Sequence, residues 1–495
     1  MSAAEINLTT RFSRLSDARL VPVFVVCYFA VQAVLVSSLS NAGGLDDGEQ
    51  LSYIGTFEWG YGGSQPPLYT WLAGIVASVF GPSLFTLQLV KFGLLASAFI
   101  SVFFAGRLLG FPQSVAVTGA LGLFLLPQIG WESQRALSHS VASTAGCAWT
   151  LLAFAWLAKT RSLPAAAAFG LAIAAALLGK YNSAIFVAAL LLSAASVPQY
   201  RSVLRWRPLL VSGLVLCAAI LPSALWMLDH AASVTARTRK FALEVGQDHM
   251  FGWLLGPASL MRAAFLFSLC LLCVAAVAWW LSRKDPAAPA LPKMDADRLI
   301  ERTVLFGLLI VLVLVVLSGA TAMKDRWLTP VLFLLPLAVS AWFHRRQPLS
   351  RVKSRLVAAS VVAALLFIPA LAVALTYGRP AKAPISQLDY RQLFETARIA
   401  EDFKTVASSS SWLAGNFRLL DPALEAVHIE TPDAAPRIKR PVLAVWNGSG
   451  APNSALVALL AEANLSIDDT QIHRFEMRYL TRDDKTLPVS YAVLP

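Results

Sequence analysis

Charged residues are scarce in this sequence. Asp, Glu, Lys and Arg make up 14% of its 495 residues, whereas 57% are hydrophobic, and the mean hydropathy is +0.62. A water-soluble protein of this length could not bury so much apolar surface. The composition therefore excludes a soluble protein and predicts an α-helical polytopic membrane protein.

Cysteine is also rare, and it occurs only within apolar stretches. The five cysteines are Cys27, Cys147, Cys217, Cys270 and Cys273. The last two form a CxxC pair, but no His or carboxylate lies nearby in the sequence. We therefore interpret all five as small apolar residues rather than as metal or redox ligands. The hydrophilic C-terminal region has no cysteine, which excludes a disulfide scaffold there.

Positive charge is missing from one segment near the N-terminal end. Residues 40–67 contain no Lys or Arg, and their acidic residues are Asp46, Asp47, Glu49 and Glu58. Carboxylates beside a membrane are costly to desolvate, and the bilayer surface offers no compensation. We interpret this acidic segment as a loop that follows the first span, and we expect it to carry the chemistry. The alternative is an ordinary solvated loop.

Eleven apolar stretches are candidate membrane spans. They are residues 20–39, 82–106, 114–128, 138–158, 164–180, 182–198, 209–228, 257–281, 302–320, 327–343 and 356–377. The pair that flanks Lys180 is short for full crossings. Residues 68–80 are apolar but too short to cross, and they follow Pro66-Pro67, so they predict a helix that lies along the outer membrane interface.

The basic residues between the spans indicate the orientation. Nineteen lie in one set of connectors: Arg11, Arg14, Arg19, Arg107, Lys159, Arg161, Arg201, Arg205, Arg207, Arg283, Lys284, Lys293, Arg298, Arg302, Arg345, Arg346, Arg351, Lys353 and Arg355. Seven lie in the opposite set: Arg135, Lys180, Arg237, Arg239, Lys240, Lys324 and Arg326. The positive-inside rule then places the N-terminus in the cytoplasm and the acidic segment outside. This topology also accounts for the net charge of +12, so no nucleic acid partner is expected.

The last part of the chain changes character. Residues 388–403 and 454–463 have helical patterns, whereas residues 426–430, 442–446, 474–480 and 489–494 read as short strands. We therefore predict a transmembrane domain over residues 1–377 and a small extracytoplasmic α/β domain over residues 378–495. We expect the second domain to cap the active site and to help select the acceptor.

Two groups of residues could take part in acid or base chemistry. Neighbouring carboxylates disfavour each other's ionised form, so one of Asp46, Asp47 and Glu49 could act as a base, or Asp46 and Asp47 could hold a divalent ion. The second group is Glu132, Arg135 and His139, in the connector after the third span. An Arg there suits a carboxylate or phosphate, and the alternative is a structural Glu–Arg pair beside a buried His.

Basic residues on the outer side form a third group. Lys324, Arg326 and Trp327 lie together at the mouth of two late spans, where two cations could bind a phosphate at headgroup level. The alternative is that they anchor the ends of the spans. Lys180 and a basic run at 237–240 are further candidates for binding substrate.

The arrangement resembles a known family. An acidic segment after the first span, the sequence Pro-Pro-Leu-Tyr-Thr-Trp-Leu at 66–72 and the late Lys-Asp-Arg-Trp-Leu-Thr-Pro at 324–330 are similar to motifs of GT-C membrane glycosyltransferases. Within that class the chain resembles the family 39-like enzymes, which include protein O-mannosyltransferases and the aminoarabinose transferase of lipid A. The combination of Asp46-Asp47-Gly48-Glu49 with Gln65 and Tyr69 looks closest to the rhizobial lipopolysaccharide galacturonosyltransferases.

The resemblance implies a function. A polyprenyl-phosphate sugar would be the donor, and a lipopolysaccharide core or lipid A would accept the sugar, with inversion, on the periplasmic face of a bacterial inner membrane. Asp46 would be the base, Asp47 and Glu49 would orient it, and Lys324 and Arg326 would bind the donor phosphate. No organic cofactor is expected.

Two differences from the aminoarabinose transferases favour another sugar. Gln65 stands where those enzymes often have Lys, and Ser138-His139-Ser140 stands where a second acid is expected. A uronic acid donor would give Arg135 or Arg237 a carboxylate to bind. A transporter or flippase of a lipid-linked sugar is the alternative function, although the sequence shows no repeated halves of the kind transporters have.

Overall fold

The chain forms two compact units. The computed structural model describes residues 19–62, 65–231, 252–286, 289–379 and 382–495. Unit 1 comprises residues 1–29, 93–229 and 235–367. Unit 2 comprises residues 30–92, 230–234 and 368–495. Three of the boundaries between the units, at residues 29/30, 92/93 and 367/368, fall inside helices.

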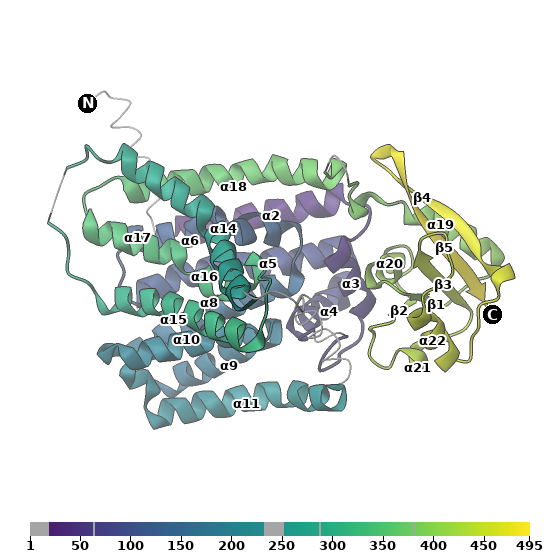
Figure 1. Cartoon of the computed structure of the whole chain (residues 1–495), viewed down its shortest axis with the longest axis horizontal. Coiled ribbons are helices and arrows are strands. Elements are labelled where there is room, and N and C mark those ends of the chain that lie inside the picture. Colours follow the sequence, from purple (N-terminus) through teal and green to yellow (C-terminus); the bar gives the residue numbers. More distant parts are fainter. Residues whose placement is uncertain (1–18, 63–64, 232–251, 287–288, 380–381) are drawn as a thin grey trace. The chain divides into compact units, whose positions relative to one another are not determined.

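Long apolar helices make up most of the chain before residue 378 (Figure 1). In chain order they are α2 (Leu20–Leu39), α4 (Leu68–Phe80), α5 (Leu84–Leu108), α6 (Gln113–Leu121), α8 (Ser138–Thr160), α9 (Leu163–Gly179), α10 (Ser183–Ser196), α11 (Trp206–Asp229), α14 (Gly252–Leu281), α15 (Asp295–Ser318), α17 (Leu335–Arg346) and α18 (Val352–Tyr377). Shorter pieces are α3 (Leu45–Tyr53), α7 (Ser133–Arg135) and α16 (Thr329–Leu332).

These helices confirm the predicted membrane architecture. Among the described residues, seven helices are long and apolar enough to cross a membrane, or up to nine if each of two bent pairs is one span. The bent pairs, at 69° and 50°, are Gln113–Leu125 with Gln128–Arg135 and Asp325–Leu332 with Leu335–Arg346. The remaining two predicted spans are the shorter helices α9 and α10, as their lengths in the sequence indicated.

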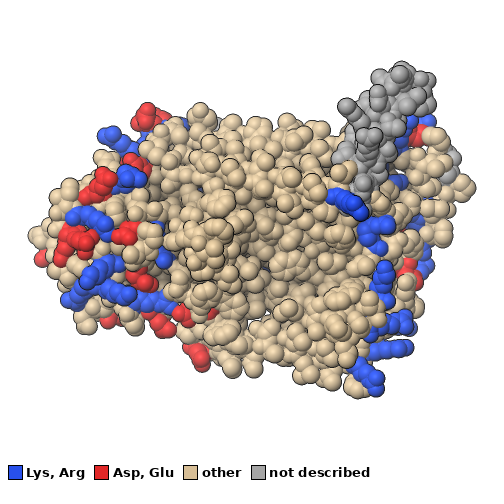
Figure 2. Space-filling view, turned by 180° about the vertical axis from the view of Figure 1, so that it is seen from behind, with Lys and Arg blue, Asp and Glu red and all other residues tan. Residues whose placement is uncertain are grey.

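The outer surface of the long helices is apolar. On the face shown in Figure 2, a broad area carries no Lys, Arg, Asp or Glu, and Lys and Arg gather along one border of it. Leucine, valine and tryptophan side chains of α11, α14 and α18 are exposed, as expected of helices that face lipid rather than water.

The acidic segment in unit 2 is a helix and not a loop, which corrects the interpretation of the sequence. Helix α3 begins at Leu45 and ends at Tyr53, and Asp46 and Asp47 lie in its first turn. Acidic side chains are stabilised there by the positive end of the helix dipole. The sequence Leu-Asp-Asp-Gly-Glu-Gln-Leu-Ser-Tyr resembles a loop because Asp and Gly are poor helix formers, so contacts elsewhere in unit 2 must stabilise this helix.

A five-stranded sheet forms the rest of unit 2. Its order is β2-β1-β3-β5-β4, with β1 parallel to both of its neighbours and β5 antiparallel to both of its own. The strands are β1 (Thr405–Ser408), β2 (Glu425–His428), β3 (Val442–Asn447), β4 (His473–Tyr479) and β5 (Arg482–Leu494). The helices are α19 (Tyr390–Ala400), α20 (Ser411–Asn416), α21 (Ala434–Arg437) and α22 (Ser454–Glu462).

Both faces of this sheet are covered. Val406 and Leu443 pack on one face with residues of α19 and α20, whereas Ala407 and Ala444 pack on the other face with α22 (Figure 1). The alternation along β1 and β3 is that of strands buried on both sides. The structure therefore confirms the predicted α/β fold of this region, while the domain boundary at residue 378 stays a prediction.

Candidate functional site

Asp47 on helix α3 lies in a buried ion pair. Its side chain is 3.1 Å from the ammonium of Lys91, measured from Oδ1 to Nζ, and Gln88 donates a hydrogen bond to Oδ2 at 3.0 Å. Lys91 is only 1% exposed, and both partner residues belong to α5. The carboxylate of Asp47 is thus neutralised inside unit 2, because a buried charge needs a partner of opposite sign.

Glu49 is buried as well, and Gln65 lies against it. The side-chain nitrogen of Gln65 is 3.4 Å from each carboxylate oxygen of Glu49. The next residue of α3, Gln50, accepts a hydrogen bond of 2.7 Å from Thr70. These contacts join α3 to the segment that begins α4, so two of the predicted site residues do lie together.

Asp46 differs from the other two acids in its exposure. It is partly exposed, whereas Asp47 and Glu49 are 7% and 8% exposed. Successive residues of a helix point about 100° apart, so Asp46 and Asp47 do not share a face of α3. Asp46 is therefore the acid of α3 that a substrate could reach most easily.

The residues around α3 include aromatic side chains that are not exposed. Tyr69 is fully buried, and its hydroxyl donates to the carbonyl oxygen of Leu87 at 3.3 Å. Burial raises the pKa of Tyr61 to about 12, so its hydroxyl stays protonated and donates to the carbonyl oxygen of Thr56 at 2.6 Å. The predicted substrate-binding role of Tyr69 stays a prediction, and its position favours a role in packing.

A divalent ion does not fit the acids of α3 well. Lys91 already supplies the positive charge beside Asp47, and an ammonium so close would repel a metal ion. Among the described residues there is no group of three or more His, Cys, Asp and Glu side chains that could hold a metal. The ion predicted at Asp46 and Asp47 thus stays a prediction, and no step of the chemistry is derived from it.

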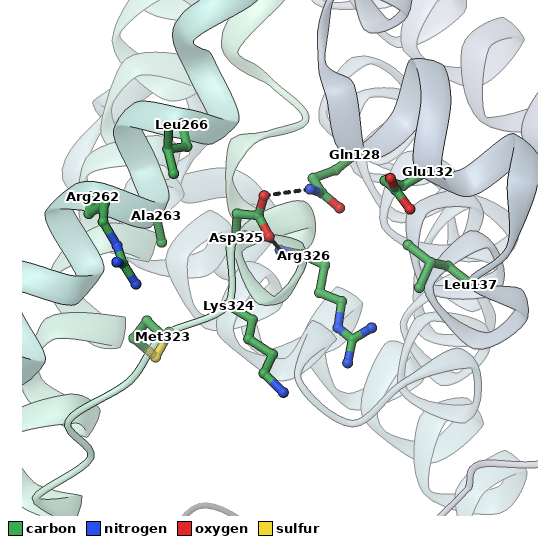
Figure 3. A pocket seen from close by; sticks show the side chains of 10 residues that line it. All are labelled: Gln128, Glu132, Leu137, Arg262, Ala263, Leu266, Met323, Lys324, Asp325 and Arg326. Carbon is green, nitrogen blue, oxygen red and sulfur yellow. Dashed lines mark hydrogen bonds between the residues drawn. The ribbon is translucent and has the colours of Figure 1, made fainter. Parts of the chain in front are cut away.

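Unit 1 contains a polar pocket of about 480 Å³ that Figure 3 shows from close by. Its charged lining residues are Arg262, Lys324, Arg326, Glu132 and Asp325. In Figure 3 the side chains of Lys324 and Arg326 extend side by side into the same open space, and Arg262 enters from α14. The pocket therefore gathers three basic groups.

The two acidic residues of this pocket have partners of their own. Gln128 donates a hydrogen bond of 2.6 Å to Asp325, which also accepts the backbone N–H of Arg326 at 2.9 Å. Glu132 is 2.6 Å from Arg135, so the Glu–Arg pair considered from the sequence is present. The three basic side chains themselves make no ion pair within the part of the chain that the structure describes, which leaves the pocket positively charged.

Local structure explains how these residues come together. Gln128–Glu132 form a π-helical turn, a rare geometry often found at functional sites, and it follows a bend that breaks the helix after Leu125. Residues Asp325–Leu328 form a 3₁₀ turn before α16. Each break interrupts an apolar helix and brings polar side chains, Gln128 and Asp325 among them, to the pocket.

The other predicted site residues of unit 1 lie in two small groups. Lys324 is 5.9 Å from the centre of the Trp327 ring, a cation–π distance, and Asn182 donates to the Trp327 carbonyl oxygen at 3.1 Å. Lys180 donates to Ser140 at 2.9 Å, next to His139 at the start of α8. The basic run at 237–240, with Arg237, lies outside the described residues.

Three of these residues were not predicted from the sequence. Gln88 and Lys91 lie inside the predicted span 82–106, and Arg262 lies inside the predicted span 257–281. Most of their neighbours in the sequence are apolar. Lys91 and Arg262 could have been found as single ionisable side chains within long apolar stretches. Such side chains are costly to desolvate and usually mark functional or paired positions.

Comparisons with known proteins define the class. The model of the dolichyl-phosphate-mannose-protein mannosyltransferase family matches residues 64–226. The structure of ArnT from Cupriavidus metallidurans, bound to undecaprenyl phosphate, has the same fold with a TM-score of 0.57 at 13% identity, covering 94% of this chain and 97% of that one. The apo state of ArnT gives a TM-score of 0.55. The fold is therefore that of the GT-C membrane glycosyltransferases.

Sequence relatives identify the family within that class. The lipopolysaccharide core galacturonosyltransferase RgtB of Rhizobium johnstonii is 30% identical over 489 residues, which is 94% of this chain and 96% of RgtB. RgtA of the same organism is 28% identical, covering 87% of each chain. The chain belongs to this family of membrane glycosyltransferases. Membership confirms the resemblance found in the sequence and sets the transporter interpretation aside.

The Lys91–Asp47 pair generates a test of stability. Lys91→Met should destabilise the protein by about 3–5 kcal/mol, because it leaves the carboxylate of Asp47 buried without a partner. Adding Asp47→Asn should restore part of that loss, because the double variant buries no unpaired charge. The measurement is the unfolding of purified protein in detergent for both single variants and the double variant. A double variant no more stable than Lys91→Met would show that the two side chains do not depend on each other.

Proposed function

We propose that this glycosyltransferase transfers a hexuronic acid, galacturonic acid by analogy with its relatives, from a polyprenyl-phosphate donor to a lipopolysaccharide core or lipid A acceptor. The observation that carries the proposal is the similarity to RgtB over nearly the whole of both chains. The basic pocket of unit 1 offers positive charges for an anionic donor, and the acidic helix of unit 2 offers a candidate base.

The pocket suits an anionic donor. Arg262, Lys324 and Arg326 offer three positive charges, and a polyprenyl-phosphate uronic acid carries two negative groups, the phosphodiester and the sugar carboxylate. A guanidinium binds either group through two parallel hydrogen bonds, and an ammonium adds a point charge. As the sugar leaves, negative charge grows on the phosphate, and cations already in place stabilise it most strongly in a site that excludes water.

Asp46 is the proposed base. It would accept the proton of the acceptor hydroxyl while that oxygen attacks the anomeric carbon, and the donor phosphate would depart in the same step. Such a single displacement inverts the configuration of the anomeric carbon. Asp47 and Glu49 would orient Asp46 indirectly, through the contacts that fix α3, rather than by touching the substrate. A positioned base typically contributes about a hundredfold to ten-thousandfold in rate.

The same proposal includes the cellular location. The chain would lie in the inner membrane with its N-terminus in the cytoplasm, and with the acidic helix, Lys324, Arg326 and residues 378–495 in the periplasm. The excess of basic residues in one set of connectors supports this orientation. Lipopolysaccharide core would then reach the enzyme from the periplasmic side.

The role of Asp46 can be tested directly. Asp46→Asn should reduce transfer by at least about a hundredfold, because the amide cannot accept the proton, while the protein still inserts and folds. Asp469→Asn, the same substitution at an exposed acid of unit 2, is the matched control and should keep wild-type activity. The measurement is transfer by purified protein in lipid from polyprenyl-phosphate galacturonic acid to lipopolysaccharide core. Wild-type rates in Asp46→Asn would refute the assignment.

The basic pocket allows a separate test of donor binding. Replacing Arg262, Lys324 or Arg326 singly by Met should raise the KM for the donor on the order of tenfold, which corresponds to about 1.4 kcal/mol for one lost charged contact. Arg298→Met removes a surface charge elsewhere in unit 1, where Arg298 pairs with Asp295, and should leave the KM unchanged. Equal effects of all four substitutions would mean that the pocket does not bind the donor.

A further inference from the structure

The C-terminal part of unit 2 holds the N-terminal end of helix α3. The side chain of Asn416, at the end of α20, accepts the backbone N–H of Gly43 at 2.6 Å and donates to the carbonyl oxygen of Gly43 at 3.1 Å. Gly43 lies two residues before the start of α3. Asn416 is 1% exposed, so water does not compete for this pair of hydrogen bonds.

The other end of α3 is held by Arg418. Its guanidinium donates to the carbonyl oxygen of Leu51 at 3.1 Å and also to that of Ile54. Burial lowers the pKa of this guanidinium, and Arg418 makes no ion pair with any residue that the structure describes. Its charge therefore lies against the carbonyl end of α3, where a cation is stabilised by the helix dipole.

Between these two ends the backbones are in direct contact. An added Cβ at Gly415 would lie 2.0 Å from the carbonyl oxygen of Gly48, and one at Gly48 would lie 2.7 Å from the Cα of Trp412. No side chain can separate α20 from α3 at this crossing. A shift of α20 would therefore be transmitted directly to α3.

The contacts of α20 with the sheet make it a rigid support. Leu413 and Ala414 of α20, and Phe417 just after it, are fully buried in the core on one face of the sheet. Asn416 also donates to the hydroxyl of Tyr390, a residue of that core, at 3.3 Å and to the carbonyl oxygen of Trp412 at 2.8 Å. Asn416 therefore links α3 to the core, whereas the hydrogen bonds of Arg418 are made with the C-terminal end of α3 and with Ile54 just after it.

We infer that Asn416 and Arg418 are positioning residues for sugar transfer. They fix the two ends of α3 and thereby place the carboxylate of Asp46. This role is separate from the expected role of residues 378–495 in selecting the acceptor. The inference rests on the proposed role of Asp46 as the base. Misplacing a catalytic group by about 1 Å is enough to reduce the rate on the order of a hundredfold.

Helix α22, on the other face of the same sheet, offers control contacts of the same kind at exposed side chains. Arg440 donates to the carbonyl oxygen of Asn464 at 2.6 Å, just after the end of α22, and Asn453 accepts the N–H of Leu456 at 2.9 Å at its start. Arg440→Met and Asn453→Ala therefore remove the same kinds of contact as Arg418→Met and Asn416→Ala, at a helix without catalytic residues.

The experiment compares these four variants, and Arg418→Lys as a fifth, in the full-length protein. Arg418→Met and Asn416→Ala should lower kcat on the order of a hundredfold with little change in the KM for the donor, because the basic pocket is untouched. Arg418→Lys should recover much of the rate, since an ammonium also donates to carbonyl oxygens. The control variants should keep the wild-type kcat. Equal losses in Arg418→Met and Arg440→Met would refute the inference, because they would indicate a general loss of stability.

Hydrogen exchange separates this inference from the proposed function. Arg418→Met should speed exchange of the amides in residues 45–53 and leave those in residues 454–462 unchanged. Unchanged exchange in α3 would overturn the inference even if the enzyme works as proposed. A third outcome is that Arg418→Met speeds exchange in α3 while the wild-type enzyme transfers no uronic acid. That outcome would support the conclusion that Arg418 holds α3 in place, and it would refute the proposed function.

Discussion

The buried ion pair between Lys91 and Asp47 is the interaction on which the acidic helix depends. Helix α3 has a sequence with little intrinsic tendency to be helical, and it carries three carboxylates into unit 2. Burying such a helix is favourable only if its charges are compensated, and Lys91 and Gln88 meet this requirement for Asp47. The position of Asp46, one residue earlier, follows from that constraint.

The charged side chains differ between the two units in whether they have partners of opposite charge. In unit 2 the buried carboxylates of Asp47 and Glu49 have partners within the protein. Lys91 forms an ion pair with Asp47, and the side-chain amide of Gln65 lies against Glu49. In unit 1 the pocket keeps Lys324, Arg326 and Arg262 without ion pairs among the described residues, while its own acids are held by Gln128 and Arg135. Basic side chains without acidic partners are suited to binding an anionic ligand.

Much of the fold follows from the sequence, because long apolar runs and strand patterns are local signals. The helices α2 and α4 and four of the five strands lie where the sequence predicts them. Strand β1 was missed because it has only four residues and runs into the serines at 408–411, and α3 was taken for a loop. Lys91 and Arg262 were not predicted as site residues, because the acid that pairs with Lys91 and the other residues that line the pocket with Arg262 come from distant parts of the sequence.

The stereochemistry of the reaction tests the central claim most directly. Polyprenyl-phosphate galacturonic acid of known anomeric configuration would be supplied to the purified enzyme with lipopolysaccharide core, and the linkage in the product determined by NMR. The account predicts a product whose anomeric configuration is inverted relative to the donor, because Asp46 activates the acceptor for one direct displacement. Retention of configuration would contradict it, since one direct displacement from the side opposite the leaving group inverts the anomeric carbon.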